Sequence, residues 1–234
     1  MKPDKSMIGV ALMDAIVSPS AAFTALRTHL SWAWAALLIL VTTHLIGTYS
    51  WLGPMSPEWI VEQQLASANL PPAQENDARA MLIQVAPHAA HLTAISGIFT
   101  LITITLMLAA FYFLGERILS QSRTGYGAWF AAASWSLLPL AINSLGLAIL
   151  SLLADHPNQT LDTVNYASLN NILLHLPIGH SHYILAGALS LFYIWTAALG
   201  ATAVRVWANV TWSRALAIGF LPYTAVFGIG WIII

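Results

Sequence analysis

Cysteine is absent from this chain of 234 residues, and charged residues are scarce. Without cysteine the chain can form no disulfide, and thiolate catalysis and cysteine-ligated metal sites are excluded. Only 7% of the residues are charged, whereas a soluble domain carries about 25%. So few charges cannot cover a water-exposed surface, and 58% of the residues are hydrophobic. The composition therefore predicts an integral membrane protein.

Five apolar runs are long enough to cross a hydrocarbon core, which takes roughly 20 helical residues. We expect these spans at about residues 30–52, 91–114, 128–154, 183–203 and 213–234. Between the first two spans, Pro71-Pro72 separates two shorter and more polar helical segments, which predict an external helical hairpin. The expected fold is an all-α polytopic membrane protein with five transmembrane helices.

Residues 1–29 are expected to form a cytoplasmic lead-in that contains an interfacial helix, and residues 30–234 the transmembrane domain. The first apolar run is too long for the core of a signal peptide, which spans about 7–15 residues. We therefore expect this run to remain as a membrane span.

Basic residues are distributed unevenly between the two sides of the predicted membrane. Arg79 is the only one on the outer side, where most of the acidic residues also lie. The other seven lie in the lead-in and in the loops after the second and fourth spans: Lys2, Lys5, Arg27, Arg117, Arg123, Arg205 and Arg214. Because basic residues favour the cytoplasmic side, the N-terminus is predicted in the cytoplasm and the C-terminus outside.

The third apolar run contains a polar stripe near its middle. Ser136, Pro139 and Asn143 follow one another at helical spacing and share a face. Proline removes a backbone hydrogen bond and should kink the helix. Together with His44 in the first span, these residues are a candidate intramembrane polar site. Packing against a neighbouring helix is the alternative interpretation, because one amide side chain is a common interhelical bond.

Histidines gather toward the outer side. His88 and His91 are three residues apart, and His180 and His182 flank one serine. Imidazole pairs at such spacings can bind a divalent transition metal, so these four residues are a candidate metal site. Ordinary interfacial hydrogen bonding is the alternative. No other cofactor is expected.

Catalytic motifs are missing from the sequence. The chain has no His-Glu-x-x-His, no Gly-x-Ser-x-Gly and no intramembrane aspartate pair. None of the expected spans carries a charged residue deep within it, although such residues usually mark proton relays and ion pathways. We therefore expect a protein that is not an enzyme. Its expected partners are membrane lipids and other membrane proteins or a second copy, and nucleic acid is not among them.

Three short motifs resemble a known family. They are Ile16-Val-Ser-Pro-Ser-Ala-Ala-Phe23, Trp135-Ser-Leu-Leu-Pro139, and Ser190-Leu-Phe-Tyr-Ile-Trp195 with Gly200 and Trp212-Ser-Arg-Ala-Leu216. In order and spacing they are similar to the bacterial Yip proteins, which belong to the Yip-one domain family. The resemblance covers about residues 8–230. Two features depart from the family: Ser190 and Leu191 stand where the bacterial pattern usually has an acidic residue, and 29 residues cannot supply the long cytosolic region of the eukaryotic branch.

The resemblance implies a five-span protein of the bacterial inner membrane with a membrane-organising or partner- or lipid-binding role. Rab binding is not carried over. The alternative interpretation is a passive or weakly coupled transporter or channel for a small solute or metal ion.

Overall fold

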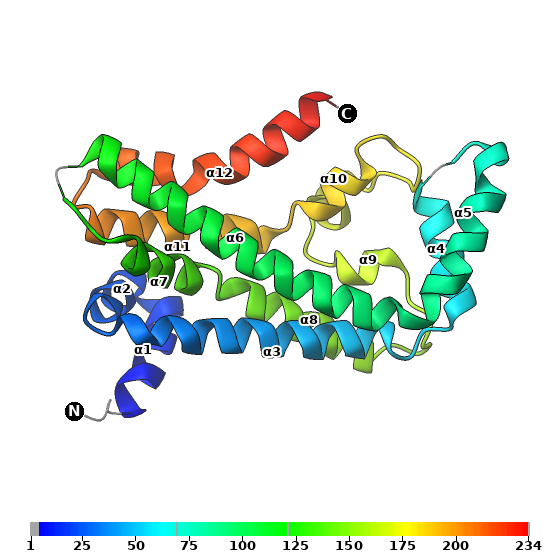
Figure 1. The fold of residues 1–234 in the computed structure, drawn as a ribbon, viewed down its shortest axis with the longest axis horizontal. Helices are drawn as coiled ribbons and strands as arrows, with labels where there is room; N and C mark the ends of the chain where they lie inside the picture. The colour runs from blue at the N-terminus through cyan, green and yellow to red at the C-terminus, as the bar shows by residue number, and fades with distance from the viewer. Residues whose placement is uncertain (1–4, 69, 121, 234) are drawn as a thin grey trace. The chain divides into compact units, whose positions relative to one another are not determined.

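The computed structural model describes residues 5–68, 70–120 and 122–233, and the chain is mainly helical there (Figure 1). Within these residues the only β-structure is an isolated antiparallel bridge between Ser168 and Ser190. The prediction of an all-α protein is confirmed. The α-helices are α1 (Lys5–Val17), α2 (Pro19–Thr28), α3 (Ala33–Leu52), α4 (Pro57–Ala68), α5 (Pro72–Val85), α6 (Ala89–Leu119), α7 (Tyr126–Ser136), α8 (Pro139–Leu152), α9 (Leu161–Val164), α10 (Tyr183–Ala188), α11 (Leu191–Trp207) and α12 (Trp212–Ile233).

Four helical stretches in the described residues are long and apolar enough to cross a membrane, so the chain is a multi-pass membrane protein. They are Leu30–Leu52, Pro72–Leu119, Tyr126–Leu152 and Trp212–Ile233. The fourth expected span, residues 183–203, instead coincides with α10 and α11, which are separate helices. At 17 residues, α11 is shorter than the roughly 20 residues that a span needs. The count of five spans therefore stays a prediction.

The third expected span is divided in two. Helix α7 ends at Ser136 and α8 begins at Pro139. Proline has no backbone N–H and cannot continue the hydrogen-bond ladder of α7, but it fits the first turn of a new helix. The Leu138 N–H donates to the Trp135 carbonyl at 3.2 Å and closes the turn between the two helices. The prediction that Pro139 distorts this helix is therefore confirmed.

The chain forms two compact units, which are described separately. Unit 1 comprises Met1–Val41, Thr100–Leu140 and Phe192–Gly228, and unit 2 comprises Thr42–Phe99, Ala141–Leu191 and Ile229–Ile234. Several helices contribute residues to both.

Buried tryptophans hold unit 1 together. Trp129, Trp135 and Trp207 are almost completely buried, and a buried indole N–H normally finds an acceptor. Trp207 donates to the Phe23 carbonyl at 2.8 Å, and Trp135 donates to the Trp32 carbonyl at 3.1 Å. Since Phe23 belongs to α2, the lead-in is bonded directly to α11. Ala22, Phe23 and Leu26 of α2 are buried as well, so α2 forms part of the core of unit 1.

Helices α11 and α12 approach each other closely within unit 1. A Cβ atom added to Gly219 would lie 2.6 Å from the Ala201 backbone nitrogen and 2.7 Å from the Ala197 carbonyl oxygen. Only glycine fits at this distance. Small residues that allow such contact are typical of helix packing in membranes.

Unit 2 contains α4, α5 and the segment 155–190. A buried apolar cluster packs α4 against the ends of the neighbouring helices, and it consists of Trp51, Leu52, Met55, Ile60, Val61, Leu65, Ala86, Ala89 and Leu147. Residues of the 155–190 segment close the start of α4. The Ser56 N–H donates to Asn158 Oδ1 and the Trp59 indole donates to the Gln159 carbonyl, both at 2.9 Å.

The interruption between α10 and α11 is bridged by backbone hydrogen bonds in unit 2. The Leu169 N–H donates to the Leu189 carbonyl at 2.7 Å, and the Leu191 N–H donates to the Ala167 carbonyl at 2.9 Å. Two backbone donors at this interruption are thus satisfied by another segment of the chain.

We expect Gly219→Ala to destabilise the protein, because the added methyl group would meet the backbone of α11. Overpacking of this kind costs about 1–3 kcal/mol. Gly228→Ala in the same helix is the matched control, since nothing lies within 4 Å of a Cβ atom there. The measurement is the thermal unfolding midpoint in detergent. Equal midpoints for the two variants would contradict the close contact.

The ion pair between α4 and α5 supplies a second prediction. Arg79 donates to Glu62 with two guanidinium nitrogens and also bonds Glu75 at 3.3 Å. The hydrogen bond from Arg79 lowers the pKa of Glu62. The stabilisation is therefore fully present above the ordinary pKa of glutamate and is lost as pH falls through the lowered value.

Arg79→Gln should accordingly raise the pKa of Glu62 toward its ordinary value, and Arg79→Lys should leave it partly lowered, because lysine keeps the charge but not the paired donors. Carboxyl chemical shifts of Glu62 followed through an acid titration would measure this. An unchanged titration in Arg79→Gln would mean that the ion pair does not form.

Candidate functional site

The predicted intramembrane polar residues are distributed over both units. Ser136 and Pro139 belong to unit 1, whereas Asn143 and His44 belong to unit 2. Ser136 is buried and donates to the Ala133 carbonyl of its own helix at 2.8 Å. The backbone carbonyl of Asn143 accepts a hydrogen bond from Tyr166 at 3.2 Å. These bonds are structural, and a ligand at these residues stays a prediction.

His44 occupies a notch on α6. Its Nε2 atom lies 3.3 Å from the Ala94 carbonyl, and a Cβ atom at Gly97 would overlap its ring. The imidazole thus fills the space that glycine leaves, and His44 packs the first span against the second.

The four outer histidines of the predicted metal site all lie in unit 2. His91 Nδ1 lies 2.7 Å from the Tyr49 hydroxyl, and His88 is exposed in the turn that precedes α6. His180 Nδ1 accepts a hydrogen bond from the His182 backbone at 3.1 Å. The His182 ring in turn stacks on Trp231.

In the described part of the chain, no three His, Cys, Asp or Glu residues are arranged to hold a metal ion. The His180 and His182 rings lie 5.6 Å apart, tilted by 50°, and a structural zinc site needs four ligands. The two sequence pairs are therefore not joined into a larger ligand set.

Glu116 carries a buried carboxylate, and its burial was not predicted from the sequence. The expected second span ended at residue 114, so Glu116 fell into the following loop. In the structure α6 continues to Leu119 and the Glu116 side chain is fully buried. Three neutral groups donate to it: the Thr124 N–H at 3.0 Å, the Thr124 hydroxyl at 2.6 Å and the Trp129 indole at 2.9 Å. The carboxylate therefore closes the loop after α6 onto α7.

A signal for this burial is present in the sequence. Thr105, Ala109, Tyr112 and Glu116 recur at helical spacing and all lie on the buried face of α6. A charged residue that continues the period of a buried face belongs to the helix rather than to the loop.

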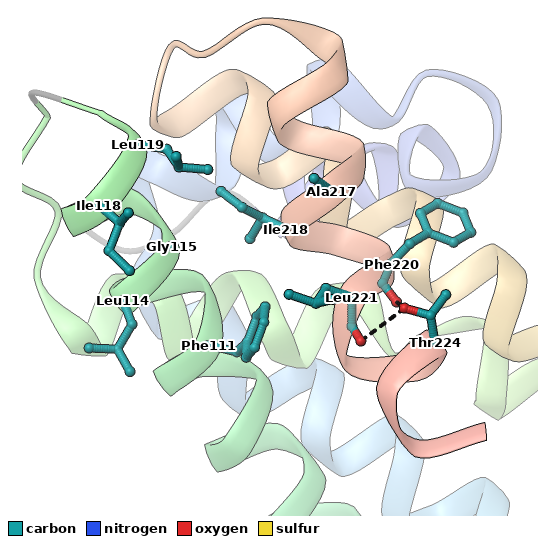
Figure 2. A pocket seen from close by; sticks show the side chains of 10 residues that line it. All are labelled: Phe111, Leu114, Gly115, Ile118, Leu119, Ala217, Ile218, Phe220, Leu221 and Thr224. Atoms are coloured by element: carbon teal, nitrogen blue, oxygen red, sulfur yellow. Dashed lines mark hydrogen bonds between the residues drawn. The ribbon is translucent and has the colours of Figure 1, made fainter. Parts of the chain in front are cut away.

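An open groove lies beside this region in unit 1, between α6 and α12. Its volume is about 560 Å³. Figure 2 shows the side chains that line it, with Ile218 and Leu221 of α12 pointing toward α6. The lining consists of Phe111, Leu114, Gly115, Ile118 and Leu119 from α6, and Ala217, Ile218, Phe220, Leu221 and Thr224 from α12.

The groove is apolar in its chemistry. Thr224 is the one hydroxyl among its lining residues, and it bonds carbonyls of its own helix at Phe220 (3.2 Å) and Leu221 (3.1 Å) (Figure 2). Ile118 is 78% exposed and Leu221 54% exposed, so the walls are open to the surroundings. The lining can hold a hydrocarbon chain, and it supplies no group for catalysis.

Comparison with known proteins identifies one family. The family model of the Yip1 domain, the Yip-one domain that the sequence motifs resemble, matches residues 13–234. Neither the curated proteins nor the solved structures provide a match.

The contacts of Glu116 predict different effects for two substitutions. Glu116→Ala leaves the buried Trp129 indole without an acceptor, at about 1–3 kcal/mol, and also removes the acceptor of the half-buried Thr124 N–H. Glu116→Gln should be tolerated, because its oxygen can accept from both N–H groups while its amide donates to the Thr124 hydroxyl. Thermal unfolding in detergent compares the two variants. Equal losses would show that the negative charge, and not the acceptor, is what unit 1 requires.

Proposed function

The chain belongs to the Yip1 domain family, and we propose that it is a non-enzymatic membrane-organising protein that binds membrane lipid in the groove between α6 and α12. We further propose that it lies in a bacterial inner membrane and works without a cofactor. The motifs shared with the bacterial Yip proteins support this location. Other membrane proteins or a second copy are proposed as additional partners.

The proposed topology has five spans, with α10 and α11 together as the fourth. It also has α4 and α5 outside the membrane, the N-terminus in the cytoplasm and the C-terminus in the periplasm. The seven-to-one division of basic residues supports this orientation. In this topology the ends of α6 and α12 that form the groove lie at the cytoplasmic leaflet.

The groove itself is the observation that carries lipid binding. An empty groove is unfavourable, because its lining atoms would lose dispersion contacts. Water is a poor filler, since the lining offers no free polar partner. A lipid tail is as apolar as leucine, and it is the molecule most abundant beside an exposed helix. A lipid chain is therefore the occupant that fits the groove.

Transport of a small solute or metal ion is the less supported alternative. Such a pathway needs polar or ionisable side chains through the bilayer. Among the described residues, no group of three or more metal-ligating side chains is present.

Photo-crosslinking tests lipid binding. The full chain is reconstituted into phosphatidylcholine vesicles that contain a phospholipid with a diazirine on its acyl chain, and crosslinks are mapped by mass spectrometry. We expect residues 111–119 and 217–224 to be labelled several-fold more than the exposed Ile102 and Met107, which report ordinary surface lipid. Ala217→Trp should fill the groove and remove this excess.

Val226→Trp is the matched control, because Val226 lies on the same helix, is 67% exposed and does not line the groove. It should leave the excess labelling unchanged. If wild-type groove residues are labelled no more than Ile102 and Met107, the groove is not a lipid site.

A further inference from the structure

A polar pocket lies next to the apolar groove in unit 1. It has a volume of about 340 Å³ and is lined by Leu119, Ser120, Ser122, Ala208, Asn209, Val210, Thr211 and Arg214. It is thus formed by the loop that follows α6 and by the turn between α11 and α12. Whereas the one polar side-chain group of the groove is the Thr224 hydroxyl, this pocket contains amide and guanidinium groups as well as hydroxyls.

The pocket and the groove adjoin each other. Leu119 lines both of them, and Arg214 donates to the Leu119 carbonyl at 3.3 Å. A polar site that continues into an apolar one has the shape of a single amphiphilic ligand. Within a bilayer every phospholipid brings chains as apolar as the groove, so the apolar part does not distinguish one phospholipid from another. Selectivity must therefore come from the polar part.

The charge of the polar pocket is positive. Arg214 is exposed, and its bond to Leu119 uses one of five N–H donors. Arg123, in the same loop as Ser120 and Ser122, donates to the carbonyls of these two residues at 3.0 and 2.8 Å. The pocket also includes Thr211 and Arg214 at the start of α12, where the helix dipole is positive. Glu116 is nearby in sequence, but its carboxylate is buried and bonded to Thr124 and Trp129.

The architecture of the pocket is fixed by internal hydrogen bonds. The Ser120 hydroxyl donates to the Ala208 carbonyl at 2.6 Å, and the Ser122 hydroxyl donates to the same oxygen at 3.3 Å. Asn209 has a positive φ of 49°, which asparagine tolerates better than most residues. These contacts hold the loop after α6 against the turn before α12.

We infer that the pocket binds the phosphate-containing headgroup of an anionic phospholipid whose acyl chain lies in the adjoining groove. This inference rests on the lipid-binding function proposed above and adds the class of lipid. Arg214 binds the phosphate, because guanidinium groups match its planar pairs of oxygens. Basic pockets between transmembrane helices on the cytoplasmic side are suited to such headgroups.

A zwitterionic choline headgroup fits the pocket less well. Quaternary ammonium groups are recognised by aromatic rings, or they pair with carboxylates. Among the described residues that line the pocket, none is aromatic and none is acidic. A net negative headgroup therefore complements this lining better than a neutral one.

Two photoactivatable probes with the same acyl chain, phosphatidylglycerol and phosphatidylcholine, test the inference in vesicles of constant composition. We expect the groove of the wild-type protein to be labelled about fivefold more by the anionic probe, which corresponds to one arginine near an anionic headgroup. Arg214→Gln should abolish the difference by lowering only the anionic labelling. Arg214→Lys should keep part of it.

Arg117→Gln is the matched control, because it removes the same charge from the last turn of α6, at a residue that stacks on Phe113 and does not line the pocket. It should retain the preference. Asn209→Asp provides a variant that keeps Arg214 and adds a negative charge to the lining, and it should weaken the preference.

The outcomes separate the inference from the proposed function. Equal labelling of the groove by both probes in the wild-type protein would overturn the anionic headgroup site and leave lipid binding intact. Absence of groove labelling by either probe would overturn both. If Arg117→Gln loses the preference for the anionic probe as fully as Arg214→Gln does, the preference comes from general surface charge. That result would overturn the inference that the pocket binds the headgroup.

Discussion

The hydrogen-bond requirement of three buried indoles determines how unit 1 is built. Trp129, Trp135 and Trp207 are buried almost completely, and each indole N–H left without an acceptor would cost about 1–3 kcal/mol. The acceptors come from widely separated parts of the chain: the Glu116 carboxylate, the Trp32 carbonyl and the Phe23 carbonyl. Satisfying them brings the lead-in, the start of the first span and the end of the second span to one cluster.

The two helices that line the groove, α6 and α12, are each packed against another helix of unit 1. Glu116 holds the last turns of α6 against α7, and the contact at Gly219 holds α12 against α11. Each wall of the groove is thus fixed by a different neighbour. The two helices also contact each other directly, where Ile218 packs over Gly115 and Arg214 donates to the Leu119 carbonyl. The volume that remains is a consequence of how the walls are anchored.

Apolar periodicity and helix-breaking prolines predicted much of the fold from the sequence. The all-helical character, the distortion at Pro139 and the family all followed from local patterns. The interruption between α10 and α11 did not, because residues 189–190 contain neither proline nor glycine. The backbone there forms hydrogen bonds with Ala167 and Leu169. Hydrogen bonds between segments apart in the chain produce no local sequence pattern.

The candidate site was harder to predict than the fold. The burial of Glu116 was missed because a charged residue after an apolar run was assigned to a loop. The groove depends on the separation of two helices about 100 residues apart in the chain, which no local pattern encodes. The spacing of His180 and His182 in the sequence places their rings close together, at 5.6 Å. It cannot show whether other metal-ligating side chains lie beside them. Contacts between residues that are close in the chain can be predicted from the sequence, whereas contacts between distant segments cannot.

The length of α6 has a consequence for the thickness of the surrounding bilayer. This helix has 31 residues and a rise of about 46 Å, whereas a hydrocarbon core is about 30 Å thick. Tilting of the helix, or extension of its polar ends into the headgroup layer, accommodates this length. In either case, a thinner or thicker membrane changes the depth of the last turns of α6.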